Sequence, residues 1–406
     1  MYCEYFEAGV CQSCPYIRQP NAHTFAQKTA QTAELLARTQ DPAQPIDWLE
    51  PAISDDAHFR NKAKLAVGGS VEHPTLGILD KNFQGVDLSR CLLYDPAISA
   101  AIEPLHEFVT IARLTPFDVP TNSGELKTIV IESSPSAQLM IRFVLRSTES
   151  VVRIRKHLPW LTEQIPTALV VTANILPERK AVIDGEKEIV LTNADALPLT
   201  MGGMTLYARP QSFIQTNTAI AEQLYTQARS WIDRIAARSD HSRNASTPEK
   251  RPLTVWDLYC GVGGFGLFSA GHNRHVLGIE ISNDAVESAN QSAREAQLDA
   301  HFIVGDALGT LQRVARKRGT TGQEFDSFAA RPDVVIVDPP RRGIGDLAPW
   351  LDEAAPAWII YSSCNPESLA RDLAQMPHYT PREARAFDMF PHTKHQEVAL
   401  LLARTD

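Results

Sequence analysis

Three absences limit the class of protein that this sequence can encode. No apolar run approaches the roughly 18 residues of a membrane-spanning helix. The N-terminal stretch MYCEYFEAGVCQSCPY has no basic segment followed by an apolar one, so we expect no secretory signal peptide. Lysine and arginine number 39 against 48 acidic residues, and the net charge of −9 argues against a generally basic surface. A local basic patch for nucleic acid remains possible.

Cysteine is also scarce, with six in 406 residues, which is too few for a disulfide scaffold. Without a secretory signal we expect a reducing, cytoplasmic location, where clustered cysteines indicate metal ligation or catalysis before disulfides. Cys3, Cys11 and Cys14 crowd the start of the chain, and Cys91 follows at a distance. Four thiolates suit either tetrahedral zinc or a [4Fe–4S] cluster, and the spacing alone leaves the choice open.

The chain is long enough for two or three domains at about 100–200 residues each. Up to about residue 205 it consists of short, β-branched apolar runs broken by Gly, Pro and Asp, which favours antiparallel strands. From about residue 210, apolar strands alternate with helical stretches, which is typical of a parallel, doubly wound sheet. We therefore expect a mostly antiparallel α+β domain over 1–205 and a Rossmann-like α/β domain over 206–406.

Local patterns place several elements in the second half. Apolar residues at helical spacing predict a helix over 218–237, and a second is predicted over 283–298 after the N-cap Ser282. The polar, aperiodic stretches 239–252 and 317–331 are predicted to be exposed loops. The expected buried strands are TVWDLY, HVLGIE, HFIVGD, DVVIVD and AWIIYSS.

A glycine-rich turn, CGVGGFG, follows the first of these strands directly. Glycines let the backbone turn sharply and approach a ligand closely, whereas Cys260 in this turn is expected to be a small packed residue. Glu280 ends the next strand, where a carboxylate can accept both ribose hydroxyls of an adenosine cofactor. The string satisfies G-x-G-x-x-G, so a nicotinamide dinucleotide and S-adenosylmethionine are both possible ligands of this turn.

Two further motifs follow parallel strands at their carboxyl ends, where open α/β sheets bind ligands. One is Asp338-Pro339-Pro340-Arg341, and the other is Ser362-Ser363-Cys364 before Asn-Pro. A D-P-P turn also occurs in amino-methyltransferases, where an aromatic residue normally follows the prolines. Here Arg341 follows instead, and the other strand supplies a thiol.

A thiol is the reagent that methylation of pyrimidine carbon 5 requires. Addition of a thiolate to carbon 6 makes carbon 5 nucleophilic toward a sulfonium methyl group, and a base must then remove the carbon 5 proton. We therefore expect Cys364 to be the nucleophile. Glu397 is the candidate base because it precedes the apolar run VALLL at the sheet edge, with His392 and His395 as alternatives.

The segment FRNKAK provides a candidate RNA contact. In extended form it places Arg60, Lys62 and Lys64 on one face, where they can neutralise phosphates. Phe59 or Tyr5 can stack on an unpaired base. The alternative is a charged edge strand that blocks aggregation.

The motifs PQSFIQTN, DLYCGVGGFG, GIE, DPPRRG, SSCNP and HTKHQEVALL together resemble those of the S-adenosylmethionine-dependent RNA uracil-5-methyltransferases over nearly the whole chain. Within this family, the chain looks most like members that act on 23S ribosomal RNA. The features that carry this similarity are the N-terminal cysteine group, the segment FRNKAK and the absence of an extra small barrel domain. The resemblance implies 23S ribosomal RNA as the partner, with no obligate protein partner and no membrane association. The same chemistry on another 23S uridine or on transfer RNA is the nearest alternative, ahead of an NAD-dependent oxidoreductase or a non-catalytic iron–sulfur RNA-binding protein.

The resemblance also implies roles for individual residues. Cys364 is the nucleophile and Glu397 the general base. The implied cofactor-binding residues are Gln215, Tyr259, Glu280, Asp306 and Asp338. Of these, Glu280 takes the ribose, Asp306 lies on the adenine side and Asp338 lies beside the methionyl part. The implied [4Fe–4S] ligands are Cys3, Cys11, Cys14 and Cys91, in a structural role. Gly264 departs from the family pattern, since relatives carry an asparagine there, so we expect no polar contact from it.

Overall fold

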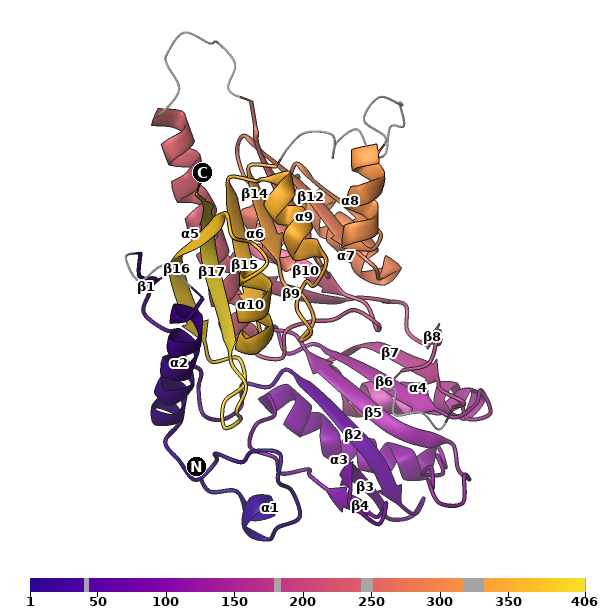
Figure 1. Ribbon diagram of the computed structural model, residues 1–406. Helices are drawn as coiled ribbons and strands as arrows, with labels where there is room; N and C mark the ends of the chain where they lie inside the picture. The colour runs from indigo at the N-terminus through magenta and orange to yellow at the C-terminus, as the bar shows by residue number, and fades with distance from the viewer. Residues whose placement is uncertain (40–43, 179–183, 242–250, 317–331, 406) are drawn as a thin grey trace.

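The computed structural model describes residues 1–39, 44–178, 184–241, 251–316 and 332–405. Two sheets organise this part of the chain: a seven-stranded sheet from the N-terminal half and an eight-stranded sheet from the C-terminal half. Figure 1 shows the first in the lower part of the molecule and the second in the upper part.

The N-terminal sheet has the strand order β4-β3-β2-β5-β6-β7-β8. Its strands are β2 (Lys62–Gly69), β3 (Pro74–Leu79), β4 (Gly85–Asp87), β5 (Leu126–Ser133), β6 (Leu139–Leu145), β7 (Ala168–Ile175) and β8 (Lys187–Val190). All neighbours are antiparallel except β6 and β7, which pair in parallel. The helix α4 (Val151–Gln164) makes the crossover that this parallel pair requires, and the sheet is otherwise antiparallel, in line with the expectation of a mostly antiparallel domain.

Strand β2 lies inside this sheet, because it pairs with both β3 and β5. Within FRNKAK, however, Lys62 to Lys64 pair with β5 alone and β3 joins only from Ala66, so the interpretation of this segment as a charged edge stays a prediction. Along β2, Ala63, Leu65 and Val67 are buried in the core formed with α4 and α3 (Pro96–Ile111). Lys62 and Lys64 alternate with them and lie on the opposite face.

The C-terminal sheet has the strand order β1-β16-β17-β15-β14-β11-β12-β13. Its strands are β1 (Asp47–Trp48), β11 (Leu253–Leu258), β12 (Arg274–Glu280), β13 (Ala300–Val304), β14 (Val334–Val337), β15 (Trp358–Ser363), β16 (Tyr379–Phe387) and β17 (Glu397–Arg404). The strands β11 to β15 are all parallel, which confirms the predicted Rossmann-like sheet. Strand β17 extends the sheet by pairing antiparallel to β15 and to β16.

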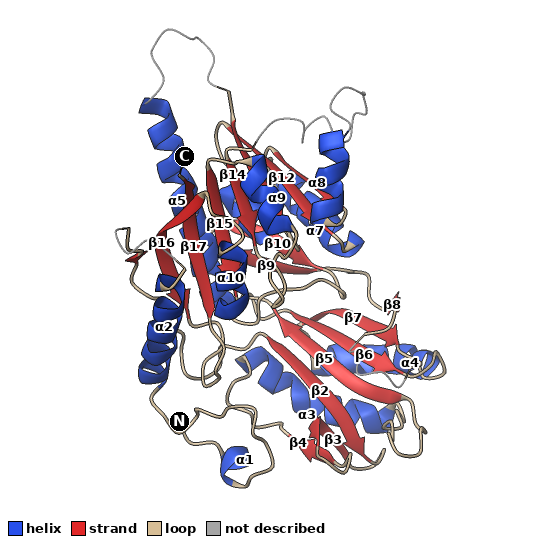
Figure 2. Cartoon of the chain, viewed as in Figure 1, coloured by secondary structure: helices blue, strands red, loops and turns tan. Residues whose placement is uncertain are grey.

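Helices cover both faces of this sheet (Figure 2). One face carries α5 (Thr218–His241), α6 (Gly264–Ser269), α7 (Asn283–Glu295) and the hairpin of β9 (Leu197–Met201) and β10 (Met204–Ala208). The other carries α2 (Asn21–Ala37), α8 (Ala307–Arg316), α9 (Leu347–Ala354) and α10 (Pro366–Leu373). No helix in the described part of the chain is both long and apolar enough to cross a lipid bilayer.

The predicted helices of the second half are confirmed. α5 covers 218–237 and continues to residue 241, so residues 239–241 are helical and not part of a loop. α7 begins after Ser282, whose hydroxyl accepts the Ala285 N–H at 3.3 Å, as expected for an N-cap. The rest of the first predicted loop up to residue 250, and the whole loop 317–331, lie outside the described residues.

The N-terminal part of the chain crosses to the C-terminal sheet. Strand β1 pairs in parallel with β16, and α2 buries Leu36 in the core beneath α8 to α10. The short helix α1 (Glu4–Glu7) instead lies with the N-terminal sheet, where Tyr5 accepts the Arg90 N–H at 3.0 Å. The division at residue 205 thus remains a prediction. β1, α2 and β9 lie before it but pack on the C-terminal sheet, and β10 crosses it.

Gly278 on β12 offers a test of how the sheet packs. A Cβ there would lie 2.1 Å from the Phe302 ring and 3.0 Å from the Cys260 sulfur. Because Phe302 is fully buried, we expect Gly278→Ala to lower the free energy of unfolding by about 1–3 kcal/mol in urea titrations. Gly271→Ala is the control, since its Cβ would meet no atom closer than 3.9 Å. Equal stability of the two variants would contradict this packing.

Candidate active site

The glycine-rich turn forms as expected between β11 and α6. Gly261 and Gly263 have φ of 53° and 86°, a backbone region that favours glycine, and Gly263 is the N-cap of α6. Asp257 at the end of β11 closes the turn, because its Oδ2 accepts the Gly266 N–H at 2.7 Å. Cys260 is buried, which confirms it as a packed residue.

Glu280 lies against this turn at the end of β12. Its Oε2 accepts the Gly261 N–H at 3.2 Å and its Oε1 accepts the Ser282 N–H at 2.9 Å. These bonds fix the carboxylate at the carboxyl edge of the sheet, while the side chain stays partly exposed. It is therefore available to accept hydroxyl groups of a ligand that lies over the turn.

Gln215 and Asp338 come together from distant segments. The Gln215 Nε2 donates to the Asp338 Oδ2 at 3.3 Å. Asn61 holds the Gln215 segment, since its Nδ2 donates to the Gln215 carbonyl at 3.0 Å and to the Thr218 hydroxyl at 2.7 Å. Burial raises the pKa of the Asp338 carboxyl, partly offset by the hydrogen bonds it accepts.

The pairing of β15 with β17 brings Cys364 and Glu397 to the same place. Ser363 pairs with Val398 in the last pair of the ladder, so Cys364 and Glu397 are the next residues along the two chains at that end. Glu397 is buried, and its Oε1 accepts the Ser362 hydroxyl at 2.7 Å. Burial and the nearby charge of Asp338 both raise the pKa of Glu397.

The Cys364 thiol is half-buried, and its surroundings disfavour the thiolate. Burial and the charge of Glu397 raise the pKa of Cys364 to about 11, although the Arg341 guanidinium acts in the opposite direction. The resting group is therefore a thiol at neutral pH. Arg341 lies beside it at the end of the D-P-P turn, where its carbonyl accepts the Asn365 Nδ2 at 2.9 Å.

The two histidines proposed as alternative bases have other partners. His392 is buried, and its Nε2 lies 2.7 Å from the Asp56 carbonyl, to which it donates. His395 lies beside Arg341, with its Nδ1 2.5 Å from an Arg341 nitrogen. Burial and the charge of Arg341 lower the pKa of His395. Glu397 is thus the candidate base whose charge acts on the thiol most strongly.

Tyr259 and Asp306 lie on the turn side of the site. Burial raises the pKa of the Tyr259 hydroxyl, and the Asp306 charge adds to this effect. Asp306 is exposed, and its Oδ2 accepts the Gly309 N–H at 2.8 Å in the first turn of α8. That bond gives Asp306 a capping role, and its contact with adenine stays a prediction.

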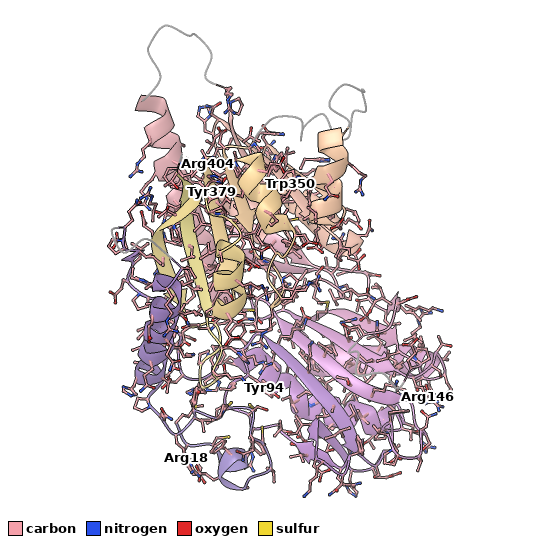
Figure 3. All side chains as sticks on the ribbon, viewed as in Figure 1. Arg18, Tyr94, Arg146, Trp350, Tyr379 and Arg404 are labelled. Carbon is pink, nitrogen blue, oxygen red and sulfur yellow. The ribbon has the colours of Figure 1, made fainter. Side chains whose placement is uncertain are left out.

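The four N-terminal cysteines line one pocket of about 170 Å³ in the lower part of the molecule. Arg60, Lys64 and Tyr94 also line it, and Figure 3 labels Tyr94. Among the described residues all six cysteines are free. In the same part of the chain, no group of three or more His, Cys, Asp or Glu side chains is close enough together to hold a metal ion.

The predicted basic row of FRNKAK is divided in the structure. Lys62 forms an ion pair with Glu132, which is fully buried. Arg60 and Lys64 line the cysteine pocket, so only these two are placed to act together. Their contact with RNA stays a prediction.

Two residues near the site were missed from the sequence. Ser362 links the carboxylates, since it donates to Glu397 and also lies within hydrogen-bond reach of Asp338. Phe213 is 66% exposed, two residues before Gln215. The sequence signal for Ser362 was a polar residue at the end of an apolar strand. The signal for Phe213 was an aromatic residue in a polar loop.

The burial of Glu397 generates a prediction about stability. Its pKa in the folded chain lies above the ordinary value of 4.5, so ionisation opposes folding once the pH rises above that value. Glu397→Gln is therefore expected to raise the free energy of unfolding by about 1–3 kcal/mol near pH 8 and less near pH 5. Thermal unfolding at both pH values measures this. Glu353→Gln, on the exposed side of α9, is the control, and a pH-independent effect of Glu397→Gln would contradict the account.

Comparison with known proteins shows the family to which the chain belongs. The family model described as tRNA (Uracil-5-)-methyltransferase matches residues 186–405. Two curated relatives, from Serratia proteamaculans and Halothiobacillus neapolitanus, are each 41% identical over 100% of both chains. Both carry the name 23S rRNA (uracil(747)-C(5))-methyltransferase RlmC.

A solved structure supports the fold. The Pyrococcus abyssi tRNA (uracil-54, C5)-methyltransferase in complex with S-adenosyl-L-homocysteine superposes with a TM-score of 0.71 at 23% identity. The match covers 96% of this chain and 85% of that one. The family match also decides between the two cofactors that the turn allows, in favour of S-adenosylmethionine, so the oxidoreductase alternative is wrong. The chain belongs to the family of S-adenosylmethionine-dependent RNA uracil-5-methyltransferases.

Proposed function

We propose that this enzyme transfers a methyl group from S-adenosylmethionine to carbon 5 of uridine 747 in 23S ribosomal RNA. The observation that carries the proposal is the pairing of Ser363 with Val398, which brings the ends of β15 and β17 together next to Cys364 and Glu397, whose charge raises the pKa of the thiol. The RNA target rests on the full-length relatives, which carry that activity in their names at 41% identity. A cytoplasmic location, where ribosomal RNA is present, belongs to the same proposal.

The cofactor site would be built around the glycine-rich turn. When bound, S-adenosylmethionine supplies a methyl group on a positively charged sulfur. Glu280, already fixed by two backbone N–H groups, would accept the ribose hydroxyls. Gln215 and Asp338 would lie at the methionyl part, where a partly buried carboxylate favours a cation. Tyr259 would pack on the ligand, and Asp306 would lie on its adenine side.

The thiol and the carboxylate would act on the uracil in turn. The Cys364 thiol would release its proton to water and add to carbon 6 as the thiolate. Carbon 5 would then take the methyl group, S-adenosylhomocysteine would be released, and a ring saturated at carbons 5 and 6 would result. Glu397 then takes the proton from carbon 5 as the bond between Cys364 and carbon 6 breaks, which returns the thiolate. The Ser362 hydroxyl orients the carboxylate for this step.

The uridine must be unpaired or flipped out, because the thiol has to reach carbon 6 from one face of the ring. Phe213, exposed on the segment that carries Gln215, offers an aromatic surface for a base. Arg60 and Lys64 offer positive charge on the N-terminal part of the molecule. Because the net charge is −9, binding would depend on such local patches and weaken strongly with salt.

The cysteine pocket supports a [4Fe–4S] cluster as part of the proposal. Cys3, Cys11, Cys14 and Cys91 face one cavity that two cationic side chains also line, which suits a group held by anionic thiolates. The cluster would tie the N-terminal segment to the loop at Cys91, with no part in methyl transfer.

The chemical roles generate a prediction about a trapped intermediate. With labelled cofactor and a 23S RNA fragment, Glu397→Gln is expected to accumulate a covalent protein–RNA adduct, seen as a shifted band on a denaturing gel. Cys364→Ala is expected to lose methylation while it keeps cofactor binding, because the thiol is not part of the cofactor site.

Two outcomes would contradict these roles. Full activity of Cys364→Ala excludes the thiol mechanism, and the absence of a band with Glu397→Gln moves the base role to another group.

Transfer RNA serves as the control substrate, on which we expect methyl incorporation to fall by about tenfold or more. Equal incorporation would exclude the proposed RNA target.

The cluster generates a prediction about metal content. Anaerobic purification is expected to give a brown protein with iron and sulfide, and Cys91→Ser should remove the colour without loss of cofactor binding. Cys260→Ser is the matched control, since this buried cysteine lies far from the pocket in sequence and in the fold. A colourless preparation that contains zinc would refute the cluster.

A further inference from the structure

Helix α2 buries four polar side chains, one of which is Thr24 at 3% exposure. Asn21, Lys28 and Thr32 are 3%, 7% and 3% exposed. Lysine is rarely buried in proteins, because its charge must leave water and find partners that compensate. Figure 1 shows α2 beside the lower ends of β16 and β17, where the loop between these strands turns.

The Lys28 ammonium binds both ends of that loop. Its Nζ lies 3.4 Å from the Asp388 Oδ1, directly after β16, and donates to the His395 carbonyl at 2.9 Å, just before β17. Asn21 adds a second bond to the same carboxylate, from its Nδ2 to the Asp388 Oδ2 at 2.5 Å. Asp388 is fully buried, so the charges of Asp388 and Lys28 compensate each other.

Gln396 continues the attachment up to the residue before Glu397. Its Nε2 donates to the Lys28 carbonyl at 3.2 Å and to the Thr32 hydroxyl. Gln396 is itself buried, at 3% exposure. The two residues that immediately precede Glu397 are therefore both held by α2.

The groups on the other side of the site follow different strands of the sheet. Asp338 and Cys364 follow β14 and β15, two parallel strands in the middle of the sheet. The glycine-rich turn and Glu280 follow β11 and β12. On the thiol side, α2 acts only indirectly, because His395, whose carbonyl Lys28 binds, lies beside Arg341. Proton removal uses Glu397, and α2 holds both of the residues that precede it.

We propose that Lys28, on α2, is a positioning residue for the removal of the carbon 5 proton. It fixes the start of β17 and so holds the Glu397 carboxylate against the Cys364 side of the uracil. The inference rests on the proposed function, in which Glu397 is the base. Helix α2 thus has a specific effect on the last chemical step, the removal of the carbon 5 proton.

The test replaces Lys28 by Met in the full-length protein, with labelled cofactor and the 23S RNA fragment. Turnover is expected to fall about tenfold, with accumulation of the covalent adduct and cofactor affinity within about twofold of the unchanged protein. A role in stability alone would lower turnover without any rise in adduct. Arg38→Met is the matched control, because Arg38 is an exposed cation just beyond the same helix.

A second variant keeps the test valid if Lys28→Met does not fold. Thr32→Val removes one partner of Gln396 without leaving a buried charge, and it is expected to raise the adduct fraction about threefold. Glu397→Gln is run on the same gel. If it gives no adduct, the proposed base role fails and the inference with it. If it traps adduct while Lys28→Met and Thr32→Val do not, the positioning role alone is overturned.

Discussion

The register between β15 and β17 determines whether this chain has an active site. Side chains alternate across a strand, so a slip by one residue would turn Glu397 away from Ser362 and Cys364. Packing on both faces of β17 secures the register. Val398, Leu400 and Leu402 are buried on the α8–α10 side, and Ala399 and Leu401 are buried on the α5–α7 side. The apolar run that follows Glu397 is thus what places its carboxylate.

Three acidic groups gather on the α5–α7 side of the sheet. Burial raises the pKa of the Tyr225 hydroxyl, and the charges of Asp338, Asp257 and Glu397 act in the same direction. Burial also raises the pKa of Asp257, to about 8. Such an arrangement opposes folding, and proteins retain it where function requires it. A cationic ligand beside Asp338 would relieve part of the repulsion.

Much of this site could be predicted from local sequence. The parallel strands, the glycine-rich turn and the helix cap at Ser282 follow from patterns a few residues long, and the structure contains each of them. The contacts of Lys28 with Asp388 and Gln396 could not be predicted, because they join residues more than 350 positions apart and α2 has the pattern of an ordinary surface helix. The parallel pairing of β6 with β7 was missed because an apolar strand does not reveal its partner.

A 23S RNA fragment that carries 5-fluorouridine at the target position gives the most direct measurement of the mechanism. Fluorine cannot leave carbon 5 as a cation, so the base step is blocked after methyl transfer. Mass spectrometry of the digested protein is expected to find the methylated fluorouridine bonded to the peptide that contains Cys364, at one adduct per chain. An adduct at another residue, or none while uridine RNA is still methylated, would contradict the thiol mechanism.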